Sequence, residues 1–107
     1  MRILGIDPGL ARVGYGLVDI DKQKNKMLDC GIIQTSSKSQ ESKRLLEIYK
    51  DLSSLIIKWE PQIAVVEKFF FYRSSNTISI VQARGVVIMT LEKFKLKILE
   101  FPPMQIK

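Results

Sequence analysis

The stretch that decides the fold lies near the start of the chain and reads Ile3-Leu4-Gly5-Ile6-Asp7-Pro8-Gly9. Its apolar residues predict a short β-strand, in which alternation places Asp7 on the face opposite Leu4 and Ile6. Pro8 cannot donate to a β-ladder and Gly9 turns freely, so we expect the strand to end at Asp7. The strand thus carries one carboxylate to its end, which suits either a metal or phosphate site or a capped turn.

A second apolar run also ends in a carboxylate and reads Gln62-Ile63-Ala64-Val65-Val66-Glu67. A run this apolar is typical of a parallel strand that is buried on both faces. Parallel strands that lie side by side bring their last residues to the same edge of the sheet. We therefore expect Asp7 and Glu67 to share a divalent cation. Two unrelated strand-end acids are the alternative.

A helix is predicted between these strands over residues 41–58, because its apolar residues recur at i, i+3, i+4 and i+7. The spacing of Ser37 and Gln40 suggests a capping box before it, Ser39 is another possible cap, and Pro61 ends the helix. We interpret the apolar stripe of this helix as core.

Two alternating runs, Val13–Ile20 and Met27–Thr35, predict strands that form an antiparallel meander with the first strand. Gly14 and Gly16 share one face of the earlier run, and a hairpin would place them beside Asp7. Glycines within a strand often mark the close approach of a ligand or another backbone.

A second helix is predicted from about Ser75 to Lys93, and a fifth strand from Phe94 to Phe101. The helix is apolar around most of its circumference, so we expect it to be buried on more than one side. Another subunit could cover one of those sides, for example over Val86 and Met89. The whole pattern predicts one α/β domain over residues 1–107, with a five-stranded mixed sheet and flanking helices.

Composition limits the possible functions. The chain has 107 residues, of which 46% are hydrophobic, with no histidine and one cysteine, Cys30. We expect neither a membrane span nor a signal peptide, and the single cysteine suits the cytoplasm. Without histidine, any metal would be held by carboxylates, which favours Mg²⁺ or Mn²⁺. The net charge of +6 indicates a polyanionic partner such as nucleic acid.

An aromatic run follows Glu67 directly and reads Lys68-Phe69-Phe70-Phe71-Tyr72-Arg73. Exposed aromatic rings among cations suit stacking on unpaired bases, at roughly 1–3 kcal/mol per base. Anchoring of the loop in the core by some of these rings is the alternative, and we expect both roles for different rings.

These residues, taken in order, resemble the RuvC-type Holliday junction resolvases, which have a ribonuclease H-like fold. The resemblance covers essentially the whole chain. The motifs that carry it are Gly5-Ile6-Asp7-Pro8-Gly9, Gly14-Tyr15-Gly16, Ala64-Val65-Val66-Glu67, Gln82-Ala83-Arg84-Gly85 and Glu100-Phe101-Pro102-Pro103-Met104-Gln105-Ile106-Lys107.

The resemblance implies a homodimeric, Mg²⁺-dependent endonuclease that nicks two strands of like polarity across a four-way DNA junction. Two metal ions about 3.5–4 Å apart would act at the scissile phosphate. Asp7 would be the central ligand and Glu67 the second. A branch-migration helicase complex of the RuvAB type would be a partner.

The resemblance also implies which residues meet DNA. Phe70 is the best match to a base-stacking aromatic, although Phe69 and Phe71 stay open, and Lys107 matches a lysine that contacts phosphate. We expect Lys68, Arg73 and Arg84 to join them at the DNA.

Members of the family are longer and carry two more catalytic carboxylates in a C-terminal helix. We therefore expect residues 1–107 alone to fold or nearly fold, to expose an apolar patch on one sheet face, and to leave junctions uncut. Glu100 is the only other acid we expect near Asp7 and Glu67.

Two other functions remain open. Asp7, Gly9 and Gly14 also resemble the first phosphate loop of actin-like ATPases. The other possibility is a fragment that binds nucleic acid or dimerises without catalysis.

Overall fold

The computed structural model describes residues 1–8, 12–22, 24–67 and 77–101. These residues form five strands and two helices: β1 (Arg2–Asp7), β2 (Arg12–Ile20), β3 (Asn25–Gln34), α1 (Glu41–Trp59), β4 (Ile63–Glu67), α2 (Thr77–Lys93) and β5 (Lys97–Phe101). Each corresponds to an element predicted from the sequence.

All five strands belong to one mixed sheet with the order β3-β2-β1-β4-β5. The first three strands form an antiparallel meander, whereas β4 and β5 run parallel to β1. The predicted α/β architecture is confirmed, and β1 occupies the centre of the sheet. The carboxyl ends of β1, β4 and β5 consequently lie at the same edge.

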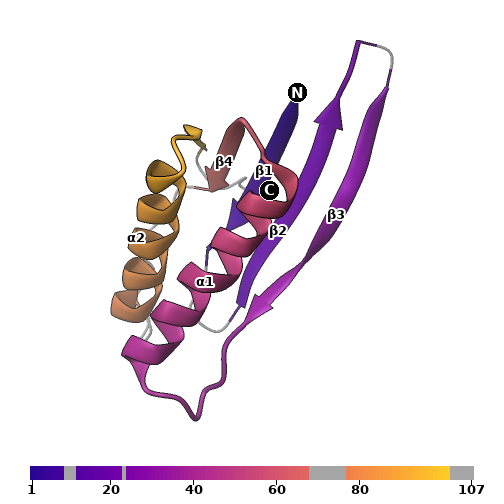
Figure 1. Cartoon of the computed structure of the whole chain (residues 1–107). Helices are drawn as coiled ribbons and strands as arrows, with labels where there is room; N and C mark the ends of the chain where they lie inside the picture. Colours follow the sequence, from indigo (N-terminus) through magenta and orange to yellow (C-terminus); the bar gives the residue numbers. More distant parts are fainter. Residues whose placement is uncertain (9–11, 23, 68–76, 102–107) are drawn as a thin grey trace, which may run out of the picture.

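The two helices cover the same face of the sheet (Figure 1). The side chains buried between the helices and the sheet include Leu4, Leu17 and Val66 from the strands, Ile48 and Leu52 from α1, and Val87 and Leu91 from α2. The apolar stripe of α1 is therefore core, as its periodicity predicts. Because strands alternate, the residues next to these in sequence point to the opposite face.

No helix covers that opposite face in the part of the chain that the structure describes (Figure 1). Ile63 and Val65 are half-buried there, so the predicted burial of this strand on both faces is wrong for the described residues. Exposed apolar side chains also lie on this face, among them Ile32, Leu99 and Phe101. Exposed apolar side chains are thus found on this face, as expected, at the two edges of the sheet.

The two ends of α1 differ in how well the sequence predicts them. Gln40 occupies the N-cap position and its side chain makes no capping hydrogen bond, so the capping box predicted from Ser37 and Gln40 is wrong. At the other end, Glu60 adopts a left-handed conformation with φ of 51°, and its N–H donates to the carbonyl of Ile56 at 2.8 Å. Pro61 follows and prevents the helix from continuing.

The strand β5 begins three residues later than predicted, because the residues after α2 close the helix first. The N–H of Phe94 donates to the carbonyl of Thr90, and Lys95 turns the chain with a φ of 61°. Extended backbone starts only at Lys97. The predicted start of α2 at Ser75 lies outside the described residues.

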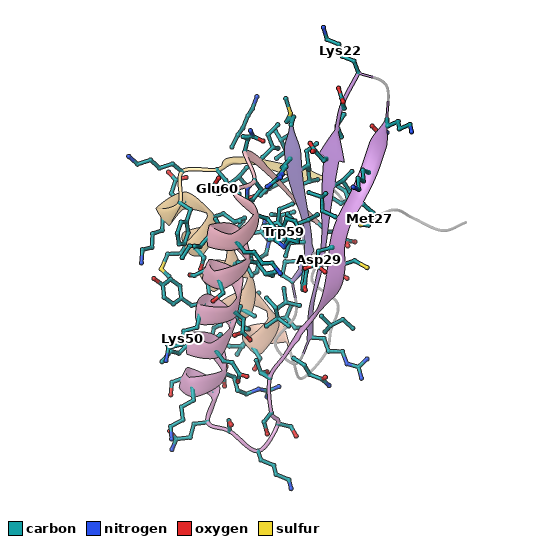
Figure 2. All side chains as sticks on the ribbon, turned by 45° about the vertical axis from the view of Figure 1, so that its right-hand side comes forward. Lys22, Met27, Asp29, Lys50, Trp59 and Glu60 are labelled. Atoms are coloured by element: carbon teal, nitrogen blue, oxygen red, sulfur yellow. The ribbon has the colours of Figure 1, made fainter. Side chains whose placement is uncertain are left out.

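The C-terminal end of α1 is tied to the start of β1 through Trp59. The guanidinium of Arg2 donates from Nη1 to the carbonyl oxygen of Trp59 at 2.6 Å and lies 5.8 Å from the centre of its ring. Figure 2 shows Trp59 on the side of α1 that faces the sheet, and Lys22 at the tip of the β2–β3 hairpin. Among the described residues, neither helix is apolar enough over a sufficient length to cross a membrane.

Candidate active site

The site contains two carboxylates, Asp7 and Glu67, at neighbouring strand ends. In the parallel pair of β1 and β4, Ile6 lies opposite Val66, so the next residue of each strand is a carboxylate. Both side chains point away from the buried face, because Ile6 and Val66 are in the core. Both carboxylates line a single open cavity of about 330 Å³. The structure therefore brings together the two acids that the sequence predicts as a pair.

Three glycines form the floor of this cavity. Gly14 lies opposite Asp7 and Gly16 lies opposite Gly5 in the antiparallel pair of β1 and β2, and all three glycines line the cavity. A Cβ built on Gly16 would meet no atom within 4 Å. The floor is therefore bare backbone, and the space above it beside Asp7 is open to a ligand.

This arrangement fits a hard divalent cation. The donors are carboxylate oxygens, which Mg²⁺ and Mn²⁺ prefer, and the bare floor leaves room for water or phosphate oxygens to complete an octahedral shell. Within the described ranges, no cluster of three or more histidine, cysteine, aspartate or glutamate side chains could hold a metal. The described part of the site thus consists of two carboxylates.

Phe101 forms another wall of the cavity, and we did not predict it from the sequence. It lies opposite Glu67 in the parallel pair of β4 and β5. Its side chain is 40% exposed and lies on the same face of the sheet as Glu67. Only the alternation of β5, which places Leu99 and Phe101 on the same face as Glu67, could have indicated this position.

Glu100 does not join the two carboxylates. It lies opposite Val66, on the helix-covered side of the sheet, where its Oε1 is 3.0 Å from Nη2 of Arg84 on α2. The expectation that Glu100 lies near Asp7 and Glu67 is therefore wrong, because neighbouring residues of a strand face opposite sides. The DNA contact expected for Arg84 stays a prediction, and its described partner is Glu100.

The other residues expected to contact DNA lie outside the described residues. They are Lys68, Phe69, Phe70, Arg73 and Lys107, together with Phe71, the third candidate for base stacking.

The side chain of Tyr15 lies on the face of β2 opposite the glycine floor. Its hydroxyl donates to the carboxylate of Asp29 on β3, and burial, followed by the negative charge of Asp29, raises the pKa of Tyr15. The phenol therefore stays neutral at physiological pH and acts as a hydrogen-bond donor. Its ring occupies the space above Gly31, where a Cβ would lie 2.8 Å from the Tyr15 hydroxyl oxygen.

The chain is similar to known proteins over its whole described length. The family model described as crossover junction endodeoxyribonuclease RuvC matches residues 3–107. The crossover junction endodeoxyribonuclease RuvC of Prochlorococcus marinus strain MIT 9211 is 69% identical over 107 residues, which cover 100% of this chain and 68% of that relative. The protein of the same name from Synechococcus sp. strain CC9605 is 66% identical, with 100% of this chain and 70% of the relative covered.

A solved structure of T. thermophilus RuvC in complex with a Holliday junction substrate has the same fold. It matches with a TM-score of 0.88 at 24% sequence identity, over 97% of this chain and 67% of that chain. At this identity, the likeness concerns the arrangement of strands and helices alone.

Proposed function

Because the chain belongs to the RuvC family of crossover junction endodeoxyribonucleases, we propose that Asp7 and Glu67 hold the divalent cation with which the full-length protein cuts a phosphodiester bond at a four-way DNA junction. The chain is a Holliday-junction-resolving endonuclease by family. The observation that supports this site is the emergence of both carboxylates, from adjacent parallel strands, into one cavity with a bare glycine floor.

The roles of the residues follow from their positions. Asp7 stands on the central strand between Gly14 and Glu67, so we assign it as the central ligand, with Glu67 as the second. When bound, Mg²⁺, or Mn²⁺ in its place, supplies positive charge at the scissile phosphate and activates water. The two carboxylates fix the position of that charge, and the glycine floor lets the DNA backbone approach it. Following the family, we assign two cations to each complete site.

Junction DNA is the proposed substrate. The net charge of +6 favours a polyanion, and the T. thermophilus structure contains a Holliday junction. We assign base stacking to Phe70, with Phe69 and Phe71 as the alternatives, and phosphate contacts to Lys68, Arg73 and Lys107. A branch-migration complex of the RuvAB type would bind the same junction and would be a partner there.

We propose that α2 forms the interface of a homodimer. Its outer face carries the exposed apolar side chains Ile78, Val81 and Met89, of which Ile78 is 73% exposed. Met89 also lines a surface groove of about 840 Å³ together with Gly85, where a second helix can approach closely. A two-fold dimer would present two equivalent sites, as symmetric nicking of a junction requires. Val86 packs against the core, so Met89 is the better interface candidate of the two.

Cleavage of synthetic DNA by the full-length protein tests this function. We expect paired nicks in a four-way junction with Mg²⁺ and none with a chelator. A linear duplex built from one of the same strands should stay intact. Equal cutting of both substrates would contradict a junction-specific enzyme. ATP hydrolysis without nicking would favour the actin-like alternative, and metal-independent binding without nicking would favour a binding fragment.

A further inference from the structure

The ion pair between Arg84 and Glu100 joins α2 to the end of β5. Their charged atoms lie 3.0 Å apart, and the side chains are 23% and 39% exposed. It is the only ion pair between two elements of secondary structure in the part of the chain described here. Both partners lie on the helix-covered side of the sheet, away from the cavity that holds the two carboxylates.

The pair nevertheless sits directly behind that cavity. Glu100 precedes Phe101, and strand alternation turns these two residues to opposite faces of the sheet. Phe101 lies opposite Glu67 and lines the cavity, whereas Glu100 is held by α2. A change in the backbone at Glu100 would therefore move the ring beside Glu67.

The end of β5 needs such support. Among the described strands, β5 pairs only with β4, so its outer edge has no ladder partner. Of its five residues, none is fully buried, and Phe101 is 40% exposed. Strand ends with few buried contacts open locally at low free-energy cost.

We propose that Arg84 and Glu100 are positioning residues for the carboxylate site. Their ion pair holds the end of β5, and thereby keeps Phe101 against Glu67, so that the Glu67 carboxylate stays directed towards Asp7. This inference rests on the proposed function of Asp7 and Glu67 as metal ligands. It assigns Arg84 a role within the protein instead of a direct contact with DNA.

The proposal predicts that the two charges act as one unit. Removing either charge abolishes the same attraction between Arg84 and Glu100, so removing the second charge as well has nothing further to abolish. The substitutions Arg84→Gln and Glu100→Gln should therefore have similar effects, and the double substitution should cost little more than either one. A direct DNA contact predicts the opposite, because Glu100→Gln would free Arg84 to bind phosphate more strongly.

The test uses the full-length protein with these three variants, and Glu47→Gln as the control. Glu47 is an exposed acid on α1, so this substitution makes the same change of charge at a distance from the cavity. The readouts are Mn²⁺ affinity by calorimetry without DNA, amide hydrogen exchange at Leu99–Phe101, and junction binding in a chelator.

We expect each single variant to lose about tenfold in Mn²⁺ affinity, at the low end of the effect of residues that orient metal ligands. Exchange at Leu99–Phe101 should become faster in the same variants. Junction binding in chelator should stay unchanged, and the Glu47→Gln control should match the wild type. If Arg84→Gln does not fold, Glu100→Gln alone carries the test.

Unchanged Mn²⁺ affinity and exchange in Glu100→Gln, with weaker junction binding in Arg84→Gln, would overturn the proposal in favour of a DNA contact. A separate variant tests the proposed metal site itself. If Asp7→Asn binds Mn²⁺ as tightly as the wild type, Asp7 is not a metal ligand. In that case, hydrogen exchange still decides whether the ion pair holds β5.

Discussion

Gly14 faces Asp7 across the pair of β1 and β2, and a Cβ built on Gly14 would lie 3.8 Å from the Cβ of Asp7. That separation is ordinary van der Waals contact, so a side chain at Gly14 would be tolerated by the protein itself. It would instead take up space beside the carboxylate. The glycine at position 14 therefore keeps space free for a ligand beside the Asp7 carboxylate, and it is not needed to avoid a clash within the fold.

Gly16 allows the sharpest test of this floor. Replacing it with valine meets no protein atom at the Cβ and suits a strand, so Gly16→Val should melt at the same temperature as the wild type or higher. Its side chain would project into the cavity and displace the substrate, and a displacement of about 1 Å can lower the rate roughly 100-fold. Junction cleavage and thermal unfolding measure the two effects.

Cys30 provides the matched control for this substitution. It lies opposite Gly16 on β3, on the same face of the sheet but one strand further from Asp7. We expect Cys30→Val to cut junctions normally. Full activity in Gly16→Val would show that the substrate does not approach the glycine floor.

Gly31 is needed for the opposite reason, because a Cβ there would collide with Tyr15. The built Cβ lies 2.8 Å from the hydroxyl oxygen and 3.1 Å from Cζ, so the half-buried ring would have to move as a whole. We expect Gly31→Ala to lower the free energy of unfolding by about 1–3 kcal/mol. Denaturant unfolding measures this loss. The double variant Gly31→Ala with Tyr15→Phe should lose less free energy of unfolding than the sum of the losses in the two single variants. Strict additivity would contradict the collision.

Much of the site follows from the sequence, for reasons visible in particular residues. Asp7 and Glu67 each end an apolar run, and two such runs joined by a helix form adjacent parallel strands. Gly14 and Gly16 alternate with buried residues, which identifies them as one face of a hairpin. Local pattern and the rules of sheet topology are enough for these four residues.

The wall formed by Phe101 could not be predicted in the same way. Its place opposite Glu67 depends on the pairing of β5 with β4, which joins two segments that are far apart in the sequence. The partner of Arg84 depends on the packing of α2 against β5, which is a tertiary contact. The exposure of one face of β4 likewise depends on which elements pack on that face of the sheet, and the composition of the strand does not determine it.

Met89 tests the proposed dimer. Met89→Glu places a charge on the outer face of α2, where it would be buried without a partner in a two-fold interface. We expect the wild-type protein to be a dimer and this variant to be a soluble monomer by light scattering. Ile57→Glu, which changes a still more exposed apolar residue on α1, should remain a dimer. A wild-type protein that is monomeric at high micromolar concentration would contradict this interface.

Phe70 tests the proposed contact with unpaired bases. Phe70→Ala should slow junction cleavage while leaving thermal stability nearly unchanged, since stacking on a base contributes roughly 1–3 kcal/mol only when DNA is bound. Phe69→Ala and Phe71→Ala, made in parallel, identify which ring stacks. A loss of several kcal/mol in the stability of Phe70→Ala would show that this ring belongs to the core.

The most direct test of the whole account compares cleavage and binding of one synthetic four-way junction by the full-length Asp7→Asn protein. The substitution removes a charged metal ligand and keeps the shape of the side chain. We predict that cleavage with Mg²⁺ is abolished while junction affinity stays close to the wild-type value, because binding depends mainly on phosphate contacts by lysine and arginine. Retained cleavage by Asp7→Asn would contradict the assignment of Asp7 as the central ligand, and with it the proposed active site.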